Sequence, residues 1–197
     1  MEQSRRVFIG HAVKGGLFVV SYTFWGPRFL YAAIDPTPEQ TAGPFYRQGA
    51  PLKERLEEPG DPGTRLTVSG QVVDTNEHPL PDTKIEIWHA NHHGQYDMDG
   101  YRYRAQLHMN NQGRYRFTTV LPGSYGERPR HIHYRISSPD HKPLITQLYF
   151  ETDPYFEGNP DKNFRKDPLL RYRELIRPVS STSDQLAVFF RICLEKS

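Results

Sequence analysis

The sequence predicts an all-β fold, an antiparallel β-sandwich with long loops. Its 197 residues include 17 Pro and 15 Gly, and 13% of them are aromatic, a composition in which many turns separate short segments. Several of these segments alternate apolar and polar side chains, as a strand with one buried face does. No amphipathic helical period separates them, which disfavours β-α-β units and favours two packed sheets.

The first strand is expected to begin at Arg65, where Leu66, Val68 and Val72 alternate with polar neighbours. A turn-rich stretch over residues 74–82 separates it from a second strand over residues 83–88. Four further strands are expected over residues 114–119, 130–136, 144–150 and 185–194. Residues 138–143 read Ser-Pro-Asp-His-Lys-Pro, and this turn chemistry predicts a hairpin between the strands on either side.

The remaining segments carry weaker signals. The charged stretch over residues 153–177 is interpreted as a surface excursion with one helical turn over residues 169–175. Cys193, the only cysteine, lies in an apolar run and is expected to be a buried, inert thiol. The 25 Lys and Arg nearly balance the 23 Asp and Glu, and they form no long basic run, so nucleic acid is not expected as a partner.

The first 33 residues differ in character from the rest of the chain. The run Ser4-Arg5-Arg6-Val7-Phe8 precedes a modest apolar stretch over residues 15–25 and the pair Ala32-Ala33. This pattern resembles a twin-arginine export signal, whose cargo is exported already folded. A signal anchor is the alternative, although the apolar stretch is short for a membrane span.

The expected organisation therefore has three parts. An export signal over residues 1–33 is followed by an arm over residues 34–64 and by a β-sandwich over residues 65–197. The β-sandwich is expected to be the domain with the functional residues. The protein is expected to be periplasmic or secreted, with only transient membrane contact through the signal.

The richest stretch chemically runs from Tyr125 to His133 and reads Tyr-Gly-Glu-Arg-Pro-Arg-His-Ile-His. If residues 130–136 form a strand, His131 and His133 project from the same face and aim two imidazoles at one point. Tyr125 on the preceding loop can bend over that point, and Arg128 places a fixed positive charge beside it. This arrangement is compatible with several metals.

Nearby carboxylates and the other histidines do not indicate which metal the stretch would bind. The next glutamate after His133 is Glu151, so a site of two histidines and one carboxylate is not favoured. A second histidine cluster, His89, His92 and His93, has no helical His-Glu-x-x-His spacing and no cysteine partner, and zinc is a weak interpretation there.

Tyrosines can supply the anionic ligands that are otherwise missing. Tyr125 lies within the stretch, and Tyr96 ends a loop soon after the strand at Trp88. A trivalent cation favours the phenolate over the phenol, so metal binding and deprotonation are coupled. Two phenolates and two neutral imidazoles suit Fe(III), and one added hydroxide would make the buried site neutral.

With these residues in view, the chain resembles the intradiol ring-cleavage dioxygenases, a non-haem iron(III) family that includes protocatechuate 3,4-dioxygenase and catechol 1,2-dioxygenase. The resemblance runs from about Thr41 to Asp153. It rests on Thr41-Ala-Gly-Pro-Phe-Tyr46, Ile85-Glu-Ile-Trp-His-Ala-Asn91 with Gly94-Gln-Tyr96, Gly113-Arg-Tyr-Arg-Phe117, Pro122-Gly-Ser-Tyr125, Arg128-Pro-Arg-His-Ile-His133 and Gln147-Leu-Tyr-Phe150.

The resemblance implies roles for individual residues. The iron ligands fall on Tyr96, Tyr125, His131 and His133. The arginine that stabilises charge falls on Arg128, and the catalytic glutamine of the Gln-x-Tyr-Phe strand falls on Gln147. A loop that lines the substrate pocket falls on Thr41, Gly43 and Pro44. The implied reaction is cleavage of a catechol-type diol by O2 to a cis,cis-muconate-type product, with Tyr125 as the labile ligand and a base.

One departure from the family pattern is visible. The interval from Tyr125 to Arg128 is shorter than in the well-known catechol and protocatechuate enzymes, which changes the shape expected for the substrate pocket. In the protocatechuate enzymes the substrate loop reaches the iron of another subunit, so residues 41–46 are compatible with a role across a homo-oligomer. The sequence does not specify the diol.

Two other functions remain compatible with the pattern. One is an exported transthyretin-like binding module, which shares the strand-turn-strand framework but performs no catalysis. The other is a zinc or copper site on His131 and His133.

Overall fold

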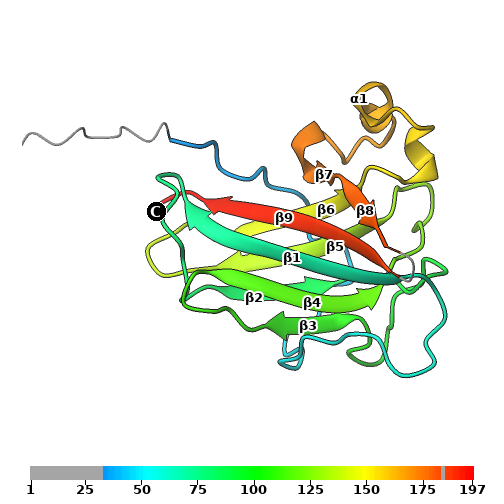
Figure 1. Cartoon of the computed structure of the whole chain (residues 1–197), viewed down its shortest axis with the longest axis horizontal. Coiled ribbons are helices and arrows are strands. Elements are labelled where there is room, and N and C mark those ends of the chain that lie inside the picture. Colours follow the sequence, from blue (N-terminus) through cyan, green and yellow to red (C-terminus); the bar gives the residue numbers. More distant parts are fainter. Residues whose placement is uncertain (1–32, 183–184) are drawn as a thin grey trace, which may run out of the picture. The chain divides into compact units, whose positions relative to one another are not determined.

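The computed structural model describes residues 33–182 and 185–197, which form two β-sheets packed face to face (Figure 1). One sheet has the strand order β4-β1-β9-β8 and the other the order β3-β2-β5-β6-β7. The strands are β1 (Arg65–Asp74), β2 (Lys84–Trp88), β3 (Arg104–Leu107), β4 (Arg114–Val120), β5 (His131–Ser137), β6 (Leu144–Phe150), β7 (Ile176–Arg177), β8 (Val179–Ser181) and β9 (Leu186–Leu194). The predicted all-β sandwich is confirmed.

The strand pairing is mixed, whereas the sequence predicted antiparallel sheets. β1 pairs antiparallel with β4 but parallel with β9, and β6 pairs parallel with β7. A parallel pair needs a long connection, and nearly the whole domain lies between β1 and β9 in the sequence. Such pairing depends on contacts between distant segments, and alternation along one strand carries no signal for it.

The six predicted strands all form, and the hairpin predicted around residues 138–143 joins β5 to β6. Three short strands were not predicted, namely β3, β7 and β8. β3 has only the four residues Arg-Ala-Gln-Leu and depends on pairing with β2, so it shows little alternation of its own.

The segment over residues 153–177 is more than the predicted surface excursion. It contains the short helices η1 (Pro154–Phe156), α1 (Pro160–Asn163), η2 (Phe164–Lys166) and η3 (Arg173–Leu175), so the helical turn predicted over residues 169–175 is confined to its last three residues. Phe156 and Leu170 are fully buried, and Asp167 is buried with them. This segment is therefore anchored to the core next to β6.

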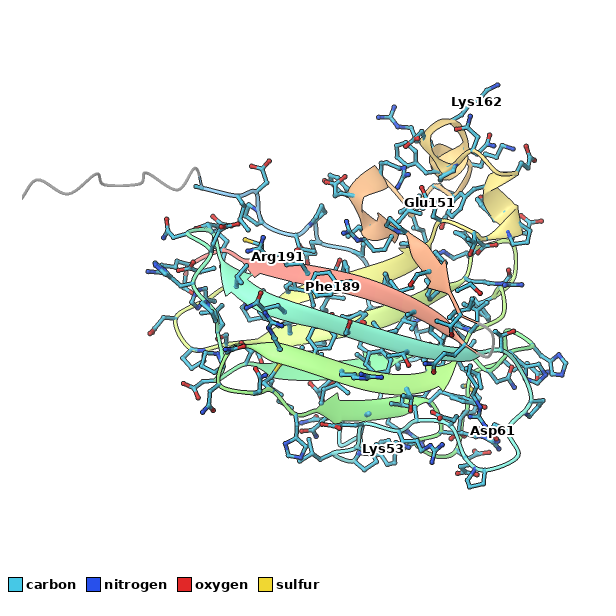
Figure 2. All side chains as sticks on the ribbon, viewed as in Figure 1. Lys53, Asp61, Glu151, Lys162, Phe189 and Arg191 are labelled. Carbon is cyan, nitrogen blue, oxygen red and sulfur yellow. The ribbon has the colours of Figure 1, made fainter. Side chains whose placement is uncertain are left out.

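The core lies between the two sheets. Alternation along β9 shows this directly, because Val188, Phe190 and Ile192 are buried while Phe189 and Arg191 are exposed (Figure 2). A second, smaller cluster forms beyond the end of β2, where the buried residues Trp88, Ala90 and Tyr96 pack against Ala42, Phe45 and Tyr46 of the arm. This second cluster adjoins the candidate site.

The export signal predicted over residues 1–33 lies outside the described residues, except for Ala33. Within the described part of the chain, no helix is both long and apolar enough to span a membrane.

Gly70 leaves space for the ring of Tyr115 to pack against β1. A Cβ at this position would overlap the ring of Tyr115 and the backbone carbonyl of Phe190, to which the Tyr115 hydroxyl donates a hydrogen bond of 2.7 Å.

We expect Gly70→Ala to lower the free energy of unfolding by roughly 2–3 kcal/mol, because the added methyl group overpacks a rigid contact. Urea denaturation measures this change. Ser69→Ala, at the half-buried neighbouring position, should change the free energy by much less, and equal effects of the two substitutions would contradict the explanation.

Candidate metal centre

His131 and His133 lie on β5, which is flanked by β2 and β6, and both side chains are buried. Their Nε2 atoms are 3.1 Å apart, so the geometry predicted from one strand period is observed. The Nδ1 of His131 lies 2.7 Å from the Pro129 carbonyl, which can only accept, and the proton is therefore on Nδ1. Its Nε2 then presents a lone pair to the site.

His133 is held from behind by Gln147. The Gln147 amide nitrogen lies 3.2 Å from the His133 Nδ1 and donates a hydrogen bond of 2.7 Å to the Thr41 carbonyl. An amide nitrogen can only donate, so the His133 Nδ1 accepts and the proton of this ring is on Nε2, which faces the lone pair of the His131 Nε2 at 3.1 Å. A cation bound between the two rings would displace that proton.

Tyr96 completes a triangle of donor atoms. Its hydroxyl lies 3.1 Å from the His133 Nε2 and 3.5 Å from the His131 Nε2. The loop that carries Tyr96 is closed by Asn91, whose carboxamide oxygen accepts hydrogen bonds from the backbone N–H groups of His93 and Gln95. The donor atom of Tyr96 is thus brought to the histidines by a loop with a fixed shape.

The loop of Tyr96 is locked to the loop that precedes Tyr125. The Gly123 N–H donates to the Asn91 carbonyl at 2.8 Å. Gly94 has a φ of 82°, and a Cβ there would overlap the carbonyl of Ser124, so only glycine allows the two loops to approach this closely. The backbone contact between these two loops therefore fixes the positions of Tyr96 and Tyr125 relative to each other.

Tyr125 borders the site but is open to solvent. Its ring centroid lies 5.6 Å from that of Tyr96 at an interplanar angle of 80°, and 39% of the residue is exposed. Its hydroxyl makes no hydrogen bond to Tyr96, His131 or His133. Among the four residues implied as ligands, the structure brings three donor atoms together and places the ring of the fourth beside them.

The electrostatics of the site keep both imidazoles neutral. Burial, reinforced by the Arg128 guanidinium, lowers the pKa of His131 to about 4. Burial, together with the neighbouring His131 and Arg128, lowers the pKa of His133 well below its usual value. Burial raises the pKa of the Tyr96 phenol, which a nearby cation would have to reverse. Neutral imidazoles present the lone pairs that a metal ion requires, and a hard, highly charged ion would favour the phenolate of Tyr96, so the residues fit such an ion.

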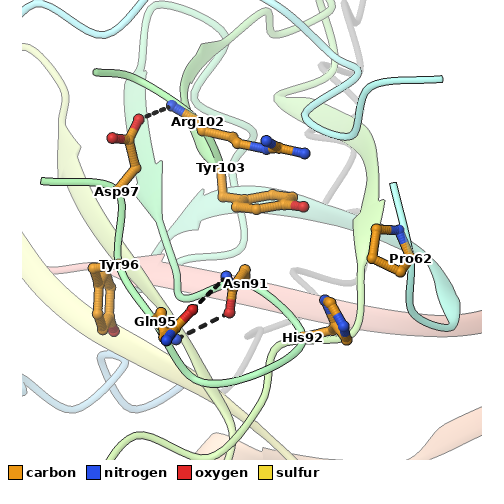
Figure 3. A pocket seen from close by; sticks show the side chains of 8 residues that line it. All are labelled: Pro62, Asn91, His92, Gln95, Tyr96, Asp97, Arg102 and Tyr103. Carbon is orange, nitrogen blue, oxygen red and sulfur yellow. Dashed lines mark hydrogen bonds between the residues drawn. The ribbon is translucent and has the colours of Figure 1, made fainter. Parts of the chain in front are cut away.

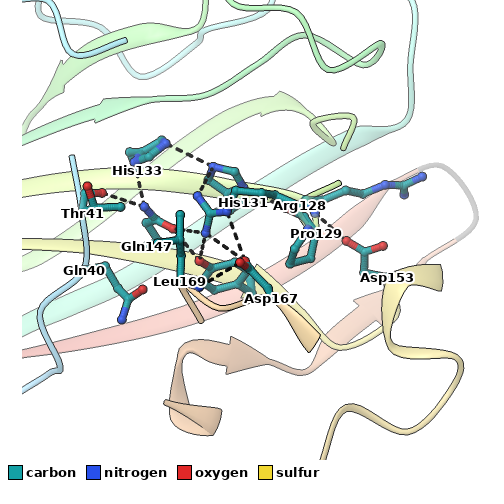
Figure 4. A network of polar contacts seen from close by, with 12 residues as sticks. Gln40, Thr41, Arg128, Pro129, His131, His133, Gln147, Asp153, Asp167 and Leu169 are labelled. Atoms are coloured by element: carbon teal, nitrogen blue, oxygen red, sulfur yellow. Dashed lines mark hydrogen bonds and ion pairs between the residues drawn. The ribbon is translucent and has the colours of Figure 1, made fainter. Parts of the chain in front are cut away.

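A polar network holds Arg128 beside the histidines (Figure 4). Its NH2 donates to the Gln147 carboxamide oxygen at 3.0 Å, to the Tyr149 hydroxyl at 2.6 Å and to Asp167 at 3.0 Å. Its NH1 lies 3.4 Å from the His131 Nε2. The guanidinium is therefore held through NH2 by these three partners, and its NH1 faces the histidines.

Residues 41–46 of the arm lie against the candidate metal centre of their own chain. Phe45 stacks on Tyr96 with ring centroids 4.1 Å apart, and a Cβ on Gly43, whose φ is 64°, would lie 3.5 Å from the Cε1 of His133. Thr41, Gly43 and Pro44 are exposed beside this contact. The sequence is compatible with a role for this loop at another subunit, whereas in the structure the loop lies beside His133 and Tyr96 of its own chain.

The second histidine cluster does not assemble into a metal site. His89 is fully buried, and its ring nitrogens bond to the Ala90 carbonyl at 2.7 Å and to the Thr119 hydroxyl at 2.8 Å. His92 instead lines an open cavity of about 320 Å³ beside Tyr96 (Figure 3). Residues 33–182 and 185–197 contain no group of three or more His, Cys, Asp and Glu side chains that could hold a metal ion. Cys193 is buried, as predicted, and burial raises the pKa of its thiol to about 11.

Three residues of the site were missed by the sequence analysis. Trp88 stacks on His133 with ring centroids 4.8 Å apart, and Tyr149 contacts Arg128. Both residues lie in motifs that were quoted for the resemblance, and strand alternation could have placed Tyr149 on the face of Gln147. No sequence pattern indicated a role for Asp167, because it lies among many charged residues in a segment that was interpreted as a surface excursion.

The neutral buried histidines make the stability of the metal-free protein depend on pH. The pKa of His89 and that of His131 are both lowered from 6.5 to about 4, so the unfolded chain binds protons in this interval that the folded chain excludes. The contribution of each histidine to the free energy of unfolding is fully present above pH 6.5. It is lost as the pH falls toward 4, by about 1.4 kcal/mol per pH unit for each group. Urea denaturation of metal-free protein across this range measures the slope. His131→Asn should reduce the slope of the free energy of unfolding against pH by the amount that one proton contributes, and an unchanged slope would contradict the lowered pKa of His131.

Comparisons with known proteins agree with this fold. A family profile described as dioxygenase matches residues 41–195. The chain is 36% identical over 146 residues to a catechol 1,2-dioxygenase of Pseudomonas sp. (strain EST1001), covering 60% of this chain and 48% of that protein. It is 32% identical over 179 residues to a chlorocatechol 1,2-dioxygenase of Rhodococcus opacus, covering 70% of this chain and 68% of that protein.

A solved structure shows the same architecture. The dioxygenase domain of a dioxygenase carbohydrate-binding protein fusion from Streptomyces sp. SirexAA-E superposes with a TM-score of 0.74 at 32% identity, covering 83% of this chain and 100% of that chain. The chain spans about half the length of the first of the curated relatives, 48% in the Pseudomonas enzyme. The family match covers most of the residues from the arm to the last strand, and the chain belongs to the intradiol dioxygenase family.

Proposed function

We propose that this protein cleaves a catechol-type aromatic diol between its two hydroxylated carbons at a non-haem Fe(III) site, with both atoms of O2 entering a cis,cis-muconate-type product. The observation that carries the proposal is the triangle formed by the Tyr96 hydroxyl and the Nε2 atoms of His131 and His133. Bound Fe(III) would supply Lewis acidity that withdraws electron density from the diol. Tyr96, Tyr125, His131 and His133 would hold it.

The charges of these residues support a trivalent ion. Two tyrosinates and two neutral imidazoles contribute two negative charges, so one further anion makes a buried ferric site neutral. The low pKa of each histidine keeps its lone pair available at neutral pH. Divalent zinc or copper on the two histidines would leave the nearby phenols without an equivalent role, and this alternative is not favoured.

The chain's own residues have distinct tasks beyond holding the metal. Tyr125 is more exposed than Tyr96, so its phenolate would be the group that accepts a proton from the incoming diol. Arg128 keeps its NH1 beside the site, where a permanent positive charge stabilises negative charge that develops on the ring. Phe45, stacked on Tyr96, excludes water from one side of the site.

A cavity of about 410 Å³ beside Arg128 is lined by Glu127, Tyr155, Lys166, Asp167, Pro168 and Leu169, and by none of the residues proposed to hold the metal. Thr41, Gly43 and Pro44 are the residues proposed to contact the substrate on the arm side. Catechol and chlorocatechol, named for the similar enzymes, are the first diols to test.

Purified iron-loaded protein should show a broad visible absorption band from tyrosinate-to-Fe(III) charge transfer, and it should convert catechol to a ring-opened product. Tyr96→Phe and His133→Ala should lose iron and the band, because each removes a ligand. Arg128→Ala should keep the iron and lose at least ~10²-fold in kcat, because it removes only charge stabilisation. Metal analysis, absorbance and oxygen uptake measure these outcomes.

Two results would contradict the proposal. A colourless protein at full iron content would exclude tyrosinate ligands, and full iron retention in His133→Ala would exclude that ligand. A colourless protein without iron and without turnover would favour the transthyretin-like binding module.

We also propose that the protein is exported in the folded state by a twin-arginine-type signal, as the pattern Ser4-Arg5-Arg6-Val7-Phe8 indicates. Replacing Arg5 and Arg6 together by Lys should shift the protein from the periplasmic fraction to the cytoplasmic fraction of a bacterial host. Fractionation followed by immunoblotting measures this shift. Replacing Lys14 by Arg is the matched control, and unchanged export after the double replacement would exclude the twin-arginine pathway.

A further inference from the structure

The Arg128 guanidinium is held by an acid from a distant part of the chain. Its Nε and NH2 both donate to the Oδ2 of Asp167, at 3.1 and 3.0 Å, across a separation of 39 residues. Gln147 and Tyr149 hold the same NH2 from β6. The only nitrogen left to face the metal centre is NH1, 3.4 Å from the His131 Nε2.

Asp167 is itself rigid. It is 3% exposed, and its Oδ1 accepts a hydrogen bond of 3.0 Å from the Leu169 N–H, which leaves Oδ2 directed at Arg128. Its backbone is fixed on both sides, since its N–H donates to the Phe164 carbonyl and its carbonyl accepts from Leu170. Leu170 is buried in the core, so this carboxylate has little freedom to move.

The backbone around Arg128 gives the side chain much less support. Arg128 ends a tight turn in which its N–H donates to the Tyr125 carbonyl at 3.0 Å, and Gly126 within the turn has a φ of 56°. Residues 124–127 are exposed. A long arginine side chain on such a turn needs contacts at its far end to keep one orientation.

We propose that Asp167 is a positioning residue, which fixes the Arg128 guanidinium so that NH1 points at the reacting diol. This inference rests on the proposed function of the metal centre. Asp167 does not touch the substrate in this role, because both of its oxygens have partners within the protein. Its contribution is to hold a catalytic charge where charge develops.

Asp167→Asn tests the proposal in the iron-loaded full chain. The amide keeps the shape of the side chain but removes its negative charge. We expect kcat to fall at least ~10-fold, because small misplacement of a catalytic group has large effects on rate. The iron content, the visible band and the KM should change little, because the ligands stay in place.

Asp153→Asn is the matched control. Asp153 is also 3% exposed and lies in the same segment, but it accepts hydrogen bonds from the backbone of Arg130 and Tyr155 and makes no contact with Arg128. Asp153→Asn should leave kcat within about 2-fold once the protein is folded. An equal loss in both variants would show that Asp167 only supports the fold, which would overturn the proposal.

Two further measurements separate positioning from a general structural role. Adding Asp167→Asn to Arg128→Ala should cause no further loss of kcat, because Asp167 acts through Arg128. Methylguanidinium should partly restore turnover to Arg128→Ala but not to the double variant, because Asp167 forms the docking point for the added cation. Multiplicative losses, or equal rescue of both variants, would overturn the proposal.

A measurement without turnover keeps this inference separate from the proposed function. In the metal-free full chain, the Arg128 Nε–H signal in nitrogen-15 NMR should be protected from exchange with water, and Asp167→Asn should abolish that protection while Asp153→Asn should not. If wild-type protein shows no ring cleavage, the proposed function fails while the NMR result still decides whether Asp167 fixes Arg128. Unchanged protection in Asp167→Asn would overturn the proposal directly.

Discussion

The rest of the site depends on two imidazole nitrogens that face each other across 3.1 Å in a buried position on β5. The protein holds both rings from behind. The Pro129 carbonyl accepts a hydrogen bond from the Nδ1 of His131, and the Gln147 amide nitrogen lies 3.2 Å from the Nδ1 of His133. A sheet that holds β5 between two neighbours is the rigid support that this pair requires.

Each further element can be understood as support for that pair. The Tyr96 loop and the loop before Tyr125 are joined at Asn91 and Gly123, so neither phenol can shift without moving the other loop. The arm covers Tyr96 through the stack of Phe45 on its ring. These contacts restrict the side chains that would hold a metal, which lowers the conformational entropy lost on binding it.

The sequence allowed the centre of the site to be predicted, and its surroundings much less. Strand alternation placed His131 and His133 on one face from local information alone, because the period of a strand does not depend on distant contacts. The short strand β3 and the parallel pairing of β9 with β1 depend on partners far away in the sequence. The burial of Asp167 has the same origin, because only the folded chain brings it to Arg128.

The position of Asp167 also explains why a charged segment that looks solvated is tied to the core. A guanidinium beside two neutral imidazoles is costly to bury unless an anion compensates it, and an anion close to the metal would compete for it as a ligand. Asp167 meets both demands, because Arg128 lies between the carboxylate and the histidines. The segment must then be held firmly enough to keep the pair together, and the buried side chains of Phe156 and Leu170 provide that hold. The charge requirement of the site therefore extends to the packing of a segment that lies outside the sheets.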